Sequence, residues 1–505
     1  MGPLVMSIDA GTTGITVLLV NAEGNPVAKA YREFPQHYPR PGWVEHDPNE
    51  IWDAVCAAAA EVSKDLRAGS LAALGITNQR ETTVVWDRRS LQPVHNAIVW
   101  QCRRSAGICD ELRSKGFEEL IRSRTGLVLD PYFSGTKLTW LMRNREDLRK
   151  RAEAGELAFG TVDTWLIARL TGGRVHATDV TNASRTMLYN IRDLSWDGEL
   201  LEIMEVPLSL LPEVLPSSHR YGSCNPDLPT GPVPISGVAG DQQAALFGQA
   251  CFEPGAAKNT YGTGSFVLTN TGTSSAMSRH GLLTTIAWHL NDTVTYALEG
   301  AIFVTGAAIQ WLRDGLGIIA RASETEPLAL TVPDAGGVHF VPALAGLGAP
   351  YWDPAARGAI SGITGGTNKA HLARAAVEAM AFQTKDVVDA MVADSGVGLK
   401  ELKVDGGASV MSLLCQFQAD LLGVPVVRPS FTETTAMGAA FLAGLAEGVW
   451  SDTDDVARHW KLDRVFEPTK SADEVRELYE GWKKAVAAVR ARASGETMRP
   501  LPEPA

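Results

Sequence analysis

The strongest constraint on the fold of this chain is a Gly/Thr turn between two short apolar strands, which occurs twice. The first copy is VMSIDAGTTGITVLL at residues 5–19, and the second is KNTYGTGSFVLT at residues 258–269. Turns of this composition are common, so each copy alone is a weak signal. Two such turns that face each other across a cleft, however, would hold one polyphosphate from both sides.

A carboxylate and two hydroxyls stand at the first turn, where an ordinary hairpin needs neither. Asp9 ends the first strand, and Thr12 and Thr13 follow it. One interpretation is a plain hairpin. The other is a phosphate-and-magnesium turn, in which backbone N–H groups and the threonine hydroxyls face the anion and Asp9 faces the metal. The segment is not a Walker P-loop, because no Gly-Lys-Ser/Thr follows and a strand comes next.

Composition and net charge limit the classes of protein to which this chain can belong. At 505 residues, 45% of them hydrophobic and 21% charged, the chain is typical of a globular protein with two or three domains. The net charge of -12 argues against nucleic acid or an anionic membrane as the main partner. The six cysteines show no CxxC spacing, so neither a zinc site nor a disulfide framework is indicated. The first residues do not read as a signal peptide, so we expect a cytoplasmic protein.

Strand and helix signals alternate along the chain, which predicts an α/β fold. The segment DPNE at residues 47–50 predicts the capped start of a helix, and residues 71–77 predict a buried strand. We expect a long helix over residues 369–393 and a loose tail in the final segment ASGETMRPLPEPA. The strand that ends in VDGGA at residues 404–408 precedes another helix, an arrangement that suits a nucleotide.

Several longer segments carry a resemblance to a known family. They are PGWVEHD at 41–47, ITNQRETT at 76–83, NAIVWQCRR at 96–104, YFSGTKLTW at 132–140, GTVDTW at 160–165, AGDQQAALFG at 239–248, GLGAPYWD at 346–353, and GAISGI at 358–363 with residues 371–378. Together with the two Gly/Thr turns, this set resembles the FGGY family of carbohydrate kinases, and within it the glycerol kinases. The similarity covers residues 4–450.

The resemblance implies an α/β protein of the actin/sugar-kinase fold, in which two actin-like (ribonuclease H-like) domains flank a nucleotide and substrate cleft. Residues 1–250 would form the polyol and phosphate side, residues 251–450 the adenosine side, and residues 451–505 a helical extension with a loose tail. It also implies ATP-dependent phosphorylation of glycerol to sn-glycerol 3-phosphate with Mg²⁺. The protein would be a cytoplasmic homo-oligomer, a dimer or tetramer, without nucleic acid or a membrane segment.

Matched position by position, the resemblance makes Asp241 the general base and places Asp9 at the magnesium ion. Without it, Asp241 would be read as a helix N-cap, and the Arg80–Glu81 pair as a surface ion pair. The polyol would be held by Arg80, Glu81, Trp100, Tyr132, Asp241, Gln242 and Phe266. The nucleotide side would comprise Thr12, Thr13, Gly14, Thr16, Thr263, Gly306, Gln310, Gly407 and Met411.

The sequence departs from the family pattern at three places. The opening turn of the family commonly reads Gly-Thr-Thr-Ser-x-Arg, whereas here Gly14 replaces the serine and Thr16 replaces the arginine. The turn expected to face the phosphates therefore lacks one hydroxyl and one cation. Met411 stands where an asparagine is frequent, so a thioether that packs replaces an amide. At Gly231-Pro232, where some bacterial glycerol kinases use a Gly-x-Arg loop to bind fructose 1,6-bisphosphate, no arginine is present. The first two changes bear on nucleotide affinity and base choice rather than on the fold.

Three alternatives accompany this interpretation. They are a kinase for another short polyol or ketose, a nucleotide-dependent regulatory protein without turnover, and an assembly or chaperone protein of the actin or Hsp70 type. The pairing of Arg80 and Glu81 with aromatic walls favours glycerol as the acceptor. Intact carboxylates at Asp9 and Asp241 favour turnover.

Overall fold

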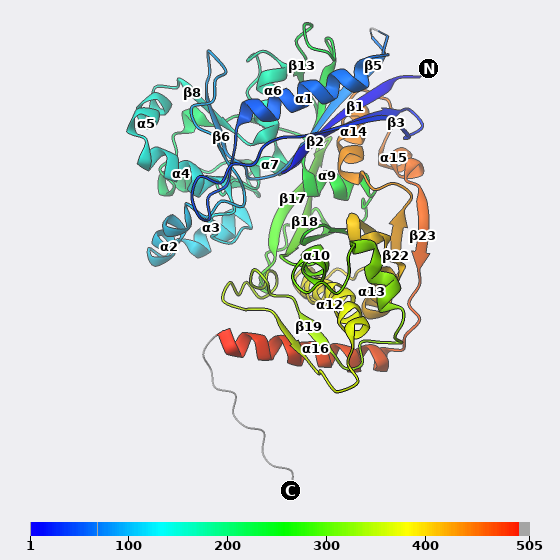
Figure 1. Cartoon of the computed structure of the whole chain (residues 1–505). Coiled ribbons are helices and arrows are strands. Elements are labelled where there is room, and N and C mark those ends of the chain that lie inside the picture. The colour runs from blue at the N-terminus through cyan, green and yellow to red at the C-terminus, as the bar shows by residue number, and fades with distance from the viewer. Residues whose placement is uncertain (1, 68, 494–505) are drawn as a thin grey trace.

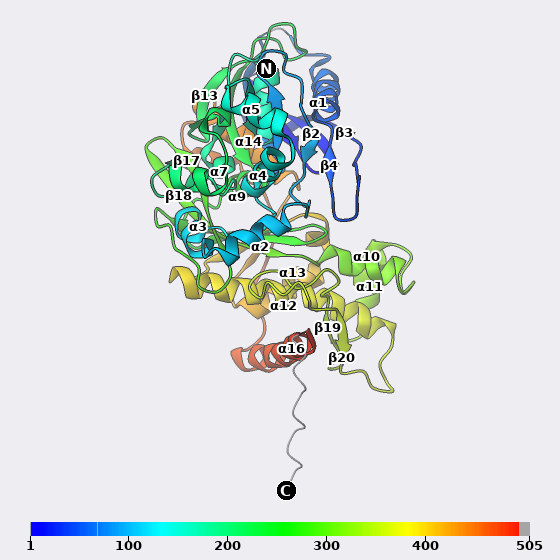
Figure 2. The ribbon, with the colours of Figure 1, turned by 90° about the vertical axis from the view of Figure 1, so that its left-hand side faces the viewer.

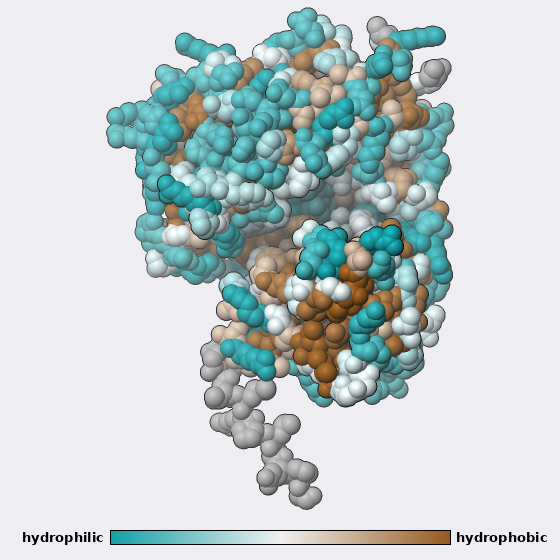
Figure 3. Space-filling view, viewed as in Figure 1, coloured by the Kyte–Doolittle hydropathy of each residue, from teal (hydrophilic) through white to brown (hydrophobic). Residues whose placement is uncertain are grey.

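The computed structural model describes residues 2–67 and 69–493. The chain forms two lobes, each built around one β-sheet, and the helix α16 (Ala472–Ala493) lies below the second lobe (Figures 1 and 2). Between the lobes the molecular surface is hollowed (Figure 3). Of the predicted loose tail, Ala493 is the last residue of α16 and the rest lies outside the described residues.

The six-stranded sheet of the first lobe has the order β13-β14-β5-β1-β2-β3. Strand β5 pairs parallel with both β1 and β14, whereas β2 pairs antiparallel with β1. The carboxyl ends of the three parallel strands therefore meet at one edge, where open α/β sheets bind ligands. The strands are β1 (Leu4–Ala10), β2 (Gly14–Asn21), β3 (Pro26–Glu33), β5 (Leu71–Asn78), β13 (Ser218–Ser223) and β14 (Pro234–Gly240).

The seven-stranded sheet of the second lobe has the order β17-β18-β16-β15-β21-β22-β23. The antiparallel pair β15–β16 lies beside the parallel neighbour β21, which repeats the arrangement of β1, β2 and β5. Each Gly/Thr turn thus connects the two strands of an antiparallel hairpin, and the first strand of that hairpin also pairs with a parallel neighbour. The strands are β15 (Ala256–Tyr261), β16 (Ser265–Gly272), β17 (Leu283–Leu290), β18 (Thr293–Ile302), β21 (Glu401–Asp405), β22 (Val426–Pro429) and β23 (Leu462–Phe466).

Helices and small two-stranded sheets complete both lobes. In the first half the helices are α1 (Pro48–Ser63), α2 (Ala106–Ser114), α3 (Glu118–Thr125), α4 (Ser134–Asn144), α5 (Glu146–Glu153), α6 (Val162–Leu170), α7 (Val180–Ala183), α8 (Gly198–Ile203), η1 (Leu208–Leu210) and α9 (Asp241–Gly248). The second half adds α10 (Gly306–Asp314), η2 (Ala322–Glu324), α11 (Thr325–Ala329), α12 (Lys369–Ser395), η3 (Gly407–Val410), α13 (Ser412–Leu422), α14 (Thr434–Ala446) and α15 (Thr453–His459). The small sheets pair β4 (Glu45–His46) with β7 (Ala97–Ile98), β6 (Val84–Asp87) with β8 (Leu157–Gly160), β9 (Ala177–Asp179) with β12 (Glu213–Leu215), β10 (Tyr189–Asn190) with β11 (Ser195–Trp196), and β19 (His339–Val341) with β20 (Ala359–Ser361).

One helix from the second half of the sequence packs on the sheet of the first lobe. Helix α14 contacts β1, β5, β14 and α9, and lies beside the strands of the upper lobe in Figure 1. Glycines permit this close approach: a Cβ on Gly75 would lie 2.1 Å from the carbonyl oxygen of Ala439, and one on Gly438 would lie 1.8 Å from that of Ala244. The domain boundaries predicted at residues 250 and 450 stay predictions. Helix α14 belongs by sequence to the predicted second domain, but it packs on the sheet of the first lobe.

Local sequence signals agree with the observed elements. Asp47 caps α1 by accepting the N–H of Asn49 at 2.8 Å, and α12 covers the long helix predicted over residues 369–393. Both Gly/Thr turns join antiparallel strands. Across the described ranges, no helix is long and apolar enough to span a bilayer.

Candidate active site

The first Gly/Thr turn lies at the sheet edge where the parallel strands end. Gly11 N–H donates to the Gly14 carbonyl at 3.0 Å, which closes the hairpin. Two amides hold the turn from the protein interior: Gln36 Nε2 donates to the Thr12 carbonyl at 2.9 Å, and Gln79 Nε2 donates to the Gly11 carbonyl at 3.1 Å. An anion would therefore meet a turn that is already fixed in one conformation.

A buried histidine joins these two amides. His46 Nε2 lies 2.7 Å from Gln36 Oε1, and His46 Nδ1 lies 3.3 Å from Gln79 Nε2. Burial lowers the pKa of His46 to about 4, so the imidazole is neutral at neutral pH. A neutral ring that donates through Nε2 and accepts through Nδ1 satisfies both glutamines at once.

Tyr31 lies against Gly14 at the end of the first turn. It stands opposite Thr16 in the pairing of β2 with β3. A Cβ on Gly14 would lie 2.6 Å from the Tyr31 hydroxyl oxygen and 2.7 Å from the Arg32 carbonyl oxygen. Position 14 therefore has no room for a side chain, which gives a physical reason for the glycine that stands in place of serine.

The second Gly/Thr turn packs against the start of α10. Gly262 N–H donates to the Gly264 carbonyl at 2.8 Å, and Gly306 N–H donates to the Gly262 carbonyl at 3.1 Å. A Cβ on Gly306 would lie 2.5 Å from the latter oxygen, so only glycine allows this contact. Thr263 is exposed beside Gly306, and Gln310 is exposed one turn further along α10.

The Asp-Gly-Gly segment lies beside the second turn. Gly406 has φ of +82° and its Cβ would lie 2.4 Å from the Tyr261 carbonyl oxygen, so a side chain is excluded. Gly407, which is exposed, begins η3, and Met411 directly follows this helix. The Met411 side chain is buried in the core of the second lobe, where its thioether packs.

Asp9 is a carboxyl group with little positive charge around it. Its pKa is raised to about 8, first by burial and then by the charges of Asp241 and Glu433, against the opposing effect of Lys29. Mg²⁺ commonly binds one or two carboxylates together with substrate phosphates and water. Within the described part of the chain, no cluster of three or more His, Cys, Asp or Glu residues could hold a metal by itself. Asp9 therefore fits an ion that takes its remaining ligands from phosphate and water.

Asp241 is the first residue of α9, directly after β14. The N-cap is Gly240, so the alternative of a capping aspartate is wrong. Asp241 Oδ1 accepts the N–H of Gln242 at 2.7 Å and lies 3.2 Å from Arg80 Nε. The Asp241 side chain is 29% exposed, so a ligand in the cleft can reach it.

Arg80 connects residues of both lobes that were predicted to hold a polyol. Its side chain and that of Glu81 are each only 1% exposed, so the alternative of a surface ion pair is wrong. Arg80 Nη1 and Nη2 donate to the two oxygens of Glu299 at 2.5 and 3.0 Å. Arg80 Nη2 also lies 3.5 Å from the Tyr132 hydroxyl, and its guanidinium carbon lies 5.9 Å from the centre of the Phe266 ring.

Glu81 has an uncommon backbone conformation. Its φ of +61° falls in the left-handed region, which is costly for a residue with a Cβ and is often retained at functional sites. The Glu81 carbonyl accepts from Ser134 Oγ at 3.0 Å and from Thr83 Oγ1 at 3.3 Å. These bonds stabilise the strained backbone that directs the carboxylate toward Arg80 and Arg185.

Four buried side chains form a closed ring of alternating charge, which we call the charge ring: Arg80, Glu81, Arg185 and Glu299. Arg185 Nε donates to Glu81 Oε1 at 2.6 Å, and Arg185 Nη2 donates to Glu299 Oε1 at 2.9 Å. Arg80 Nε closes the ring at 3.7 Å from Glu81 Oε1. Burial alone would raise the pKa of Glu299, but the two guanidinium groups hold it at about 2.

Sequence reasoning missed Arg185 and Glu299. Their ring partners lie far away along the chain, 104 residues between Arg185 and Glu81 and 219 between Glu299 and Arg80. The available signal was a glutamate inside the otherwise apolar strand YALEGAI. Such a residue is almost never buried unless it is paired.

Aromatic side chains connect the predicted polyol residues to the first turn. The Trp100 and Tyr132 rings meet edge to face with centroids 5.5 Å apart. Trp100 Nε1 donates to Thr12 Oγ1 at 3.0 Å. The buried Lys137 contacts the Tyr132 carbonyl and donates to the Phe133 carbonyl at 3.0 Å, which fixes the backbone that carries Tyr132.

Gln242 is held by a lysine that sequence reasoning also missed. Lys258 Nζ, on β15 of the second lobe, contacts Gln242 Oε1 and donates to Thr260 Oγ1 at 2.9 Å. Burial lowers the pKa of Lys258 to about 8. Lys258 therefore ties the second sheet to α9, the helix that carries Asp241.

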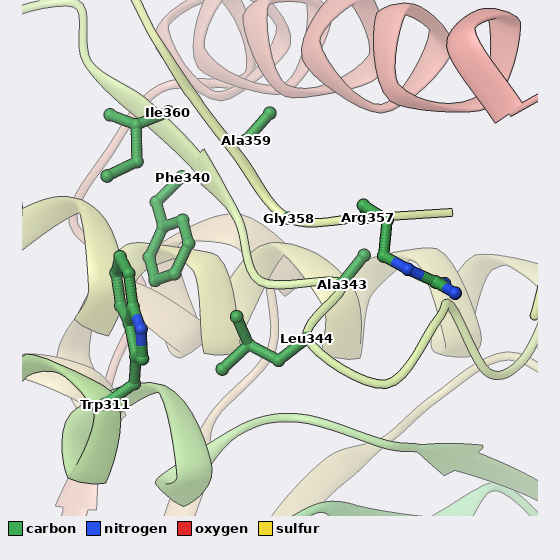
Figure 4. A pocket seen from close by; sticks show the side chains of 8 residues that line it. All are labelled: Trp311, Phe340, Ala343, Leu344, Arg357, Gly358, Ala359 and Ile360. Atoms are coloured by element: carbon green, nitrogen blue, oxygen red, sulfur yellow. The ribbon is translucent and has the colours of Figure 1, made fainter. Parts of the chain in front are cut away.

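A separate hollow of about 200 Å³ lies in the second lobe. Trp311 of α10, Phe340 of β19 and Ile360 of β20 line it (Figure 4). The lining is apolar except for Arg357, whose Nη1 already donates to two backbone carbonyls at 2.8 Å. None of the predicted site residues lines this hollow. The charge ring and the two Gly/Thr turns lie elsewhere, and we take the cleft between the lobes as the candidate active site.

Comparison with known proteins gives matches over almost the whole chain. Residues 4–248 match the N-terminal domain of the FGGY family of carbohydrate kinases, and residues 257–447 match its C-terminal domain. A glycerol kinase from Carboxydothermus hydrogenoformans is 60% identical over 489 residues, which cover 96% of this chain and 98% of that protein. Glycerol kinase 2 from Thermotoga maritima is 59% identical over 485 residues, which cover 96% and 98%.

Solved structures confirm the predicted two-domain α/β fold. Plasmodium falciparum glycerol kinase with ADP matches with a TM-score of 0.92 at 35% identity, over 97% of this chain and 98% of that one. A ligand-bound xylulose kinase from Lactobacillus acidophilus matches with a TM-score of 0.89 at 23% identity, over 98% and 100%, which shows a shared fold alone. The chain belongs to the FGGY family of carbohydrate kinases.

Proposed function

We propose that this chain catalyses the ATP-dependent phosphorylation of glycerol to sn-glycerol 3-phosphate. Relatives at 59–60% identity over almost the whole chain are glycerol kinases. The observation that carries the proposal is the position of Asp241: its partly exposed carboxylate lies 3.2 Å from the buried Arg80. Asp241 also lies close enough to Asp9, beside the first turn, to raise the pKa of that carboxyl group.

The polyol side suits a small triol. Glycerol offers three hydroxyl groups and a bare hydrocarbon edge. Arg80, Glu81 and Asp241 supply charged partners for the hydroxyls, and hydrogen bonds to charged groups are stronger than neutral ones. Trp100 and Phe266 would cover the carbon atoms and exclude water.

The nucleotide would lie along the two turns. Phosphates would meet the backbone and hydroxyl groups of the first turn and Thr263 of the second. The adenosine would lie toward Gly306, Gln310, Gly407 and the packed Met411. Mg²⁺ beside Asp9 would neutralise phosphate charge, which is the chemistry that such an ion supplies to phosphoryl transfer.

Asp241 would act as the general base. As a terminal hydroxyl oxygen of glycerol bonds to the γ-phosphorus, its proton passes to the Asp241 carboxylate, the bond to the β,γ-bridging oxygen breaks, and ADP leaves. Phosphoryl transfer needs positioning more than covalent help from the protein. Arg80 positions Asp241 from one side, and the N–H of Gln242 positions it from the other.

A coupled assay of ADP release tests the proposal. Glycerol is compared with xylulose, ribulose and longer polyols, and a reaction without acceptor serves as the control. We expect release that depends on glycerol and is negligible without acceptor. A ketose with a higher specificity constant than glycerol, or equal release without acceptor, would contradict the proposal. The resemblance also supports a homo-oligomer, which light scattering on the purified protein tests.

A further inference from the structure

We infer that Arg185 and Glu299 are positioning residues of the polyol site, because the charge ring fixes the Arg80 guanidinium and the Glu81 carboxylate in the orientation that receives substrate hydroxyls. Since both act through Arg80 and Glu81, this inference rests on the proposed function. Neither residue needs to touch the substrate to do so.

Glu299 fixes the plane of Arg80. Both carboxylate oxygens accept from the two Nη atoms, at 2.5 and 3.0 Å, and a bidentate pair of this kind sets orientation as well as distance. Glu299 Oε1 also accepts from Arg185 Nη2 at 2.9 Å. One carboxylate thus holds together two guanidinium groups that would otherwise repel each other.

Arg185 fixes Glu81 in turn. Its Nε donates to Glu81 Oε1 at 2.6 Å, and its guanidinium carbon lies 5.3 Å from the centre of the Phe133 ring and 5.7 Å from that of Tyr132. Arg185 Nη1 has no hydrogen-bond partner within the described ranges, although the side chain is fully buried. An unpaired buried donor costs free energy, so packing alone does not account for an arginine at this position.

The ring leaves acceptors free for a ligand. Among the described residues, Glu81 Oε2 takes part in no hydrogen bond, whereas Oε1 is occupied by Arg185. Asp241 stands at the edge of the ring, 3.2 Å from Arg80 Nε. Glu299 comes from β18 of the second lobe and the other three members from the first, so the ring is complete only when both lobes contribute.

The test compares two identical substitutions. Glu299→Gln removes the ring charge while keeping the side-chain shape. The matched control is Glu378→Gln, because Glu378 is also buried and pairs with one arginine, Arg374, at 2.6 Å on α12 of the second lobe. We expect Glu299→Gln to raise the KM for glycerol on the order of tenfold or more and the KM for ATP by less than about twofold. Glu378→Gln should leave both values within about twofold, because Glu378 pairs with Arg374 and takes no part in the charge ring. Thermal unfolding confirms that each variant is folded.

A second variant keeps the inference testable if Glu299→Gln does not fold. Arg185→Lys retains the charge, but one ammonium group cannot reproduce the fork that reaches both carboxylates, so the KM for glycerol should rise several-fold. A parent protein that does not phosphorylate glycerol would refute the proposed function itself. An active parent with a folded Glu299→Gln variant that keeps its KM for glycerol, or changes both KM values equally, would overturn the inference and leave the proposed function standing.

Discussion

The proposed polyol side and the proposed phosphate side of the cleft are built from different kinds of chemical group. On the polyol side, buried charged side chains make the site, and every member of the charge ring is at most 1% exposed. On the phosphate side, two Gly/Thr turns and the Asp-Gly-Gly segment make the site, and Thr13 and Thr263 are exposed. The groups that would contact phosphate there belong mainly to the backbone.

Two of the three departures from the family pattern lie on the proposed nucleotide side. They are Gly14 with Thr16 at the first turn and Met411 directly after η3, whereas Pro232 lies before β14. In contrast, every charged or aromatic residue that the resemblance places on the polyol side is present. The nucleotide side is constrained in another way, because positions 14, 306 and 406 leave no room for a side chain.

The largest expected effect is that of Asp241→Asn, at the junction of the two sides. The amide retains the shape and hydrogen bonding of the carboxylate but cannot accept the proton, so kcat should fall on the order of 10²–10⁴-fold. Glycerol affinity, measured by calorimetry, should stay within a few-fold. A variant that turns over within tenfold of the parent would show that Asp241 only orients other groups.

The second effect is acid destabilisation of the first turn through His46. Its pKa of about 4 lies below the ordinary value of 6.5, so the unfolded chain binds this proton more readily and stability is lost as the pH falls from 6.5 toward 4. The shift corresponds to about 3 kcal/mol in unfolding free energy. Urea unfolding of the parent and of His46→Gln at pH 7, 5.5 and 4.5 checks this, because glutamine cannot titrate. Equal pH slopes in the two proteins would contradict it.

The third effect is discrimination among acceptors on the polyol side. An acceptor with additional CHOH units would leave buried hydroxyl groups unpaired, at about 1–3 kcal/mol each, so glycerol should be preferred by roughly tenfold or more for each unit. Specificity constants for glycerol, erythritol and ribitol at saturating ATP measure the preference. A rise in the specificity constant with acceptor length would indicate an open site that does not enclose its substrate.

The smallest effect should come from the adenosine side. Because Met411 only packs, ATP should be preferred over GTP and ITP by a modest factor, and Met411→Asn should increase the preference several-fold, since a neutral hydrogen bond contributes about 0.5–1.5 kcal/mol. Specificity constants for the three nucleotides at saturating glycerol decide this. A parent that already prefers ATP a thousandfold would show that other residues recognise the base.

The features that sequence reasoning predicted are those that local patterns determine. The two hairpins, the cap at Asp47 and the helix α12 each depend on residues close together in the chain. The family resemblance then supplied expected roles for residues that local patterns alone would assign to caps or surface pairs, such as Asp241 and Arg80. The structure removes both of those alternatives.

The features that were missed depend on contacts between distant segments. The partners of Glu299 and Arg185 cannot be read from any local period, because they lie more than 100 residues away. The same holds for the packing of α14 on the first sheet and for Lys258, which crosses from one lobe to the other. Tyr31 became informative only when the structure placed its hydroxyl against Gly14.

The most direct test of the proposed function is the fate of the γ-phosphoryl group. Phosphorus NMR of the protein with ATP, Mg²⁺ and glycerol follows that group through the reaction. We predict that the γ-phosphorus signal is replaced by that of a phosphate monoester coupled to the primary CH₂ of glycerol, with an equal amount of ADP and little inorganic phosphate. A product that is inorganic phosphate alone, or no loss of ATP while glycerol and Mg²⁺ are saturating, would contradict the proposed function.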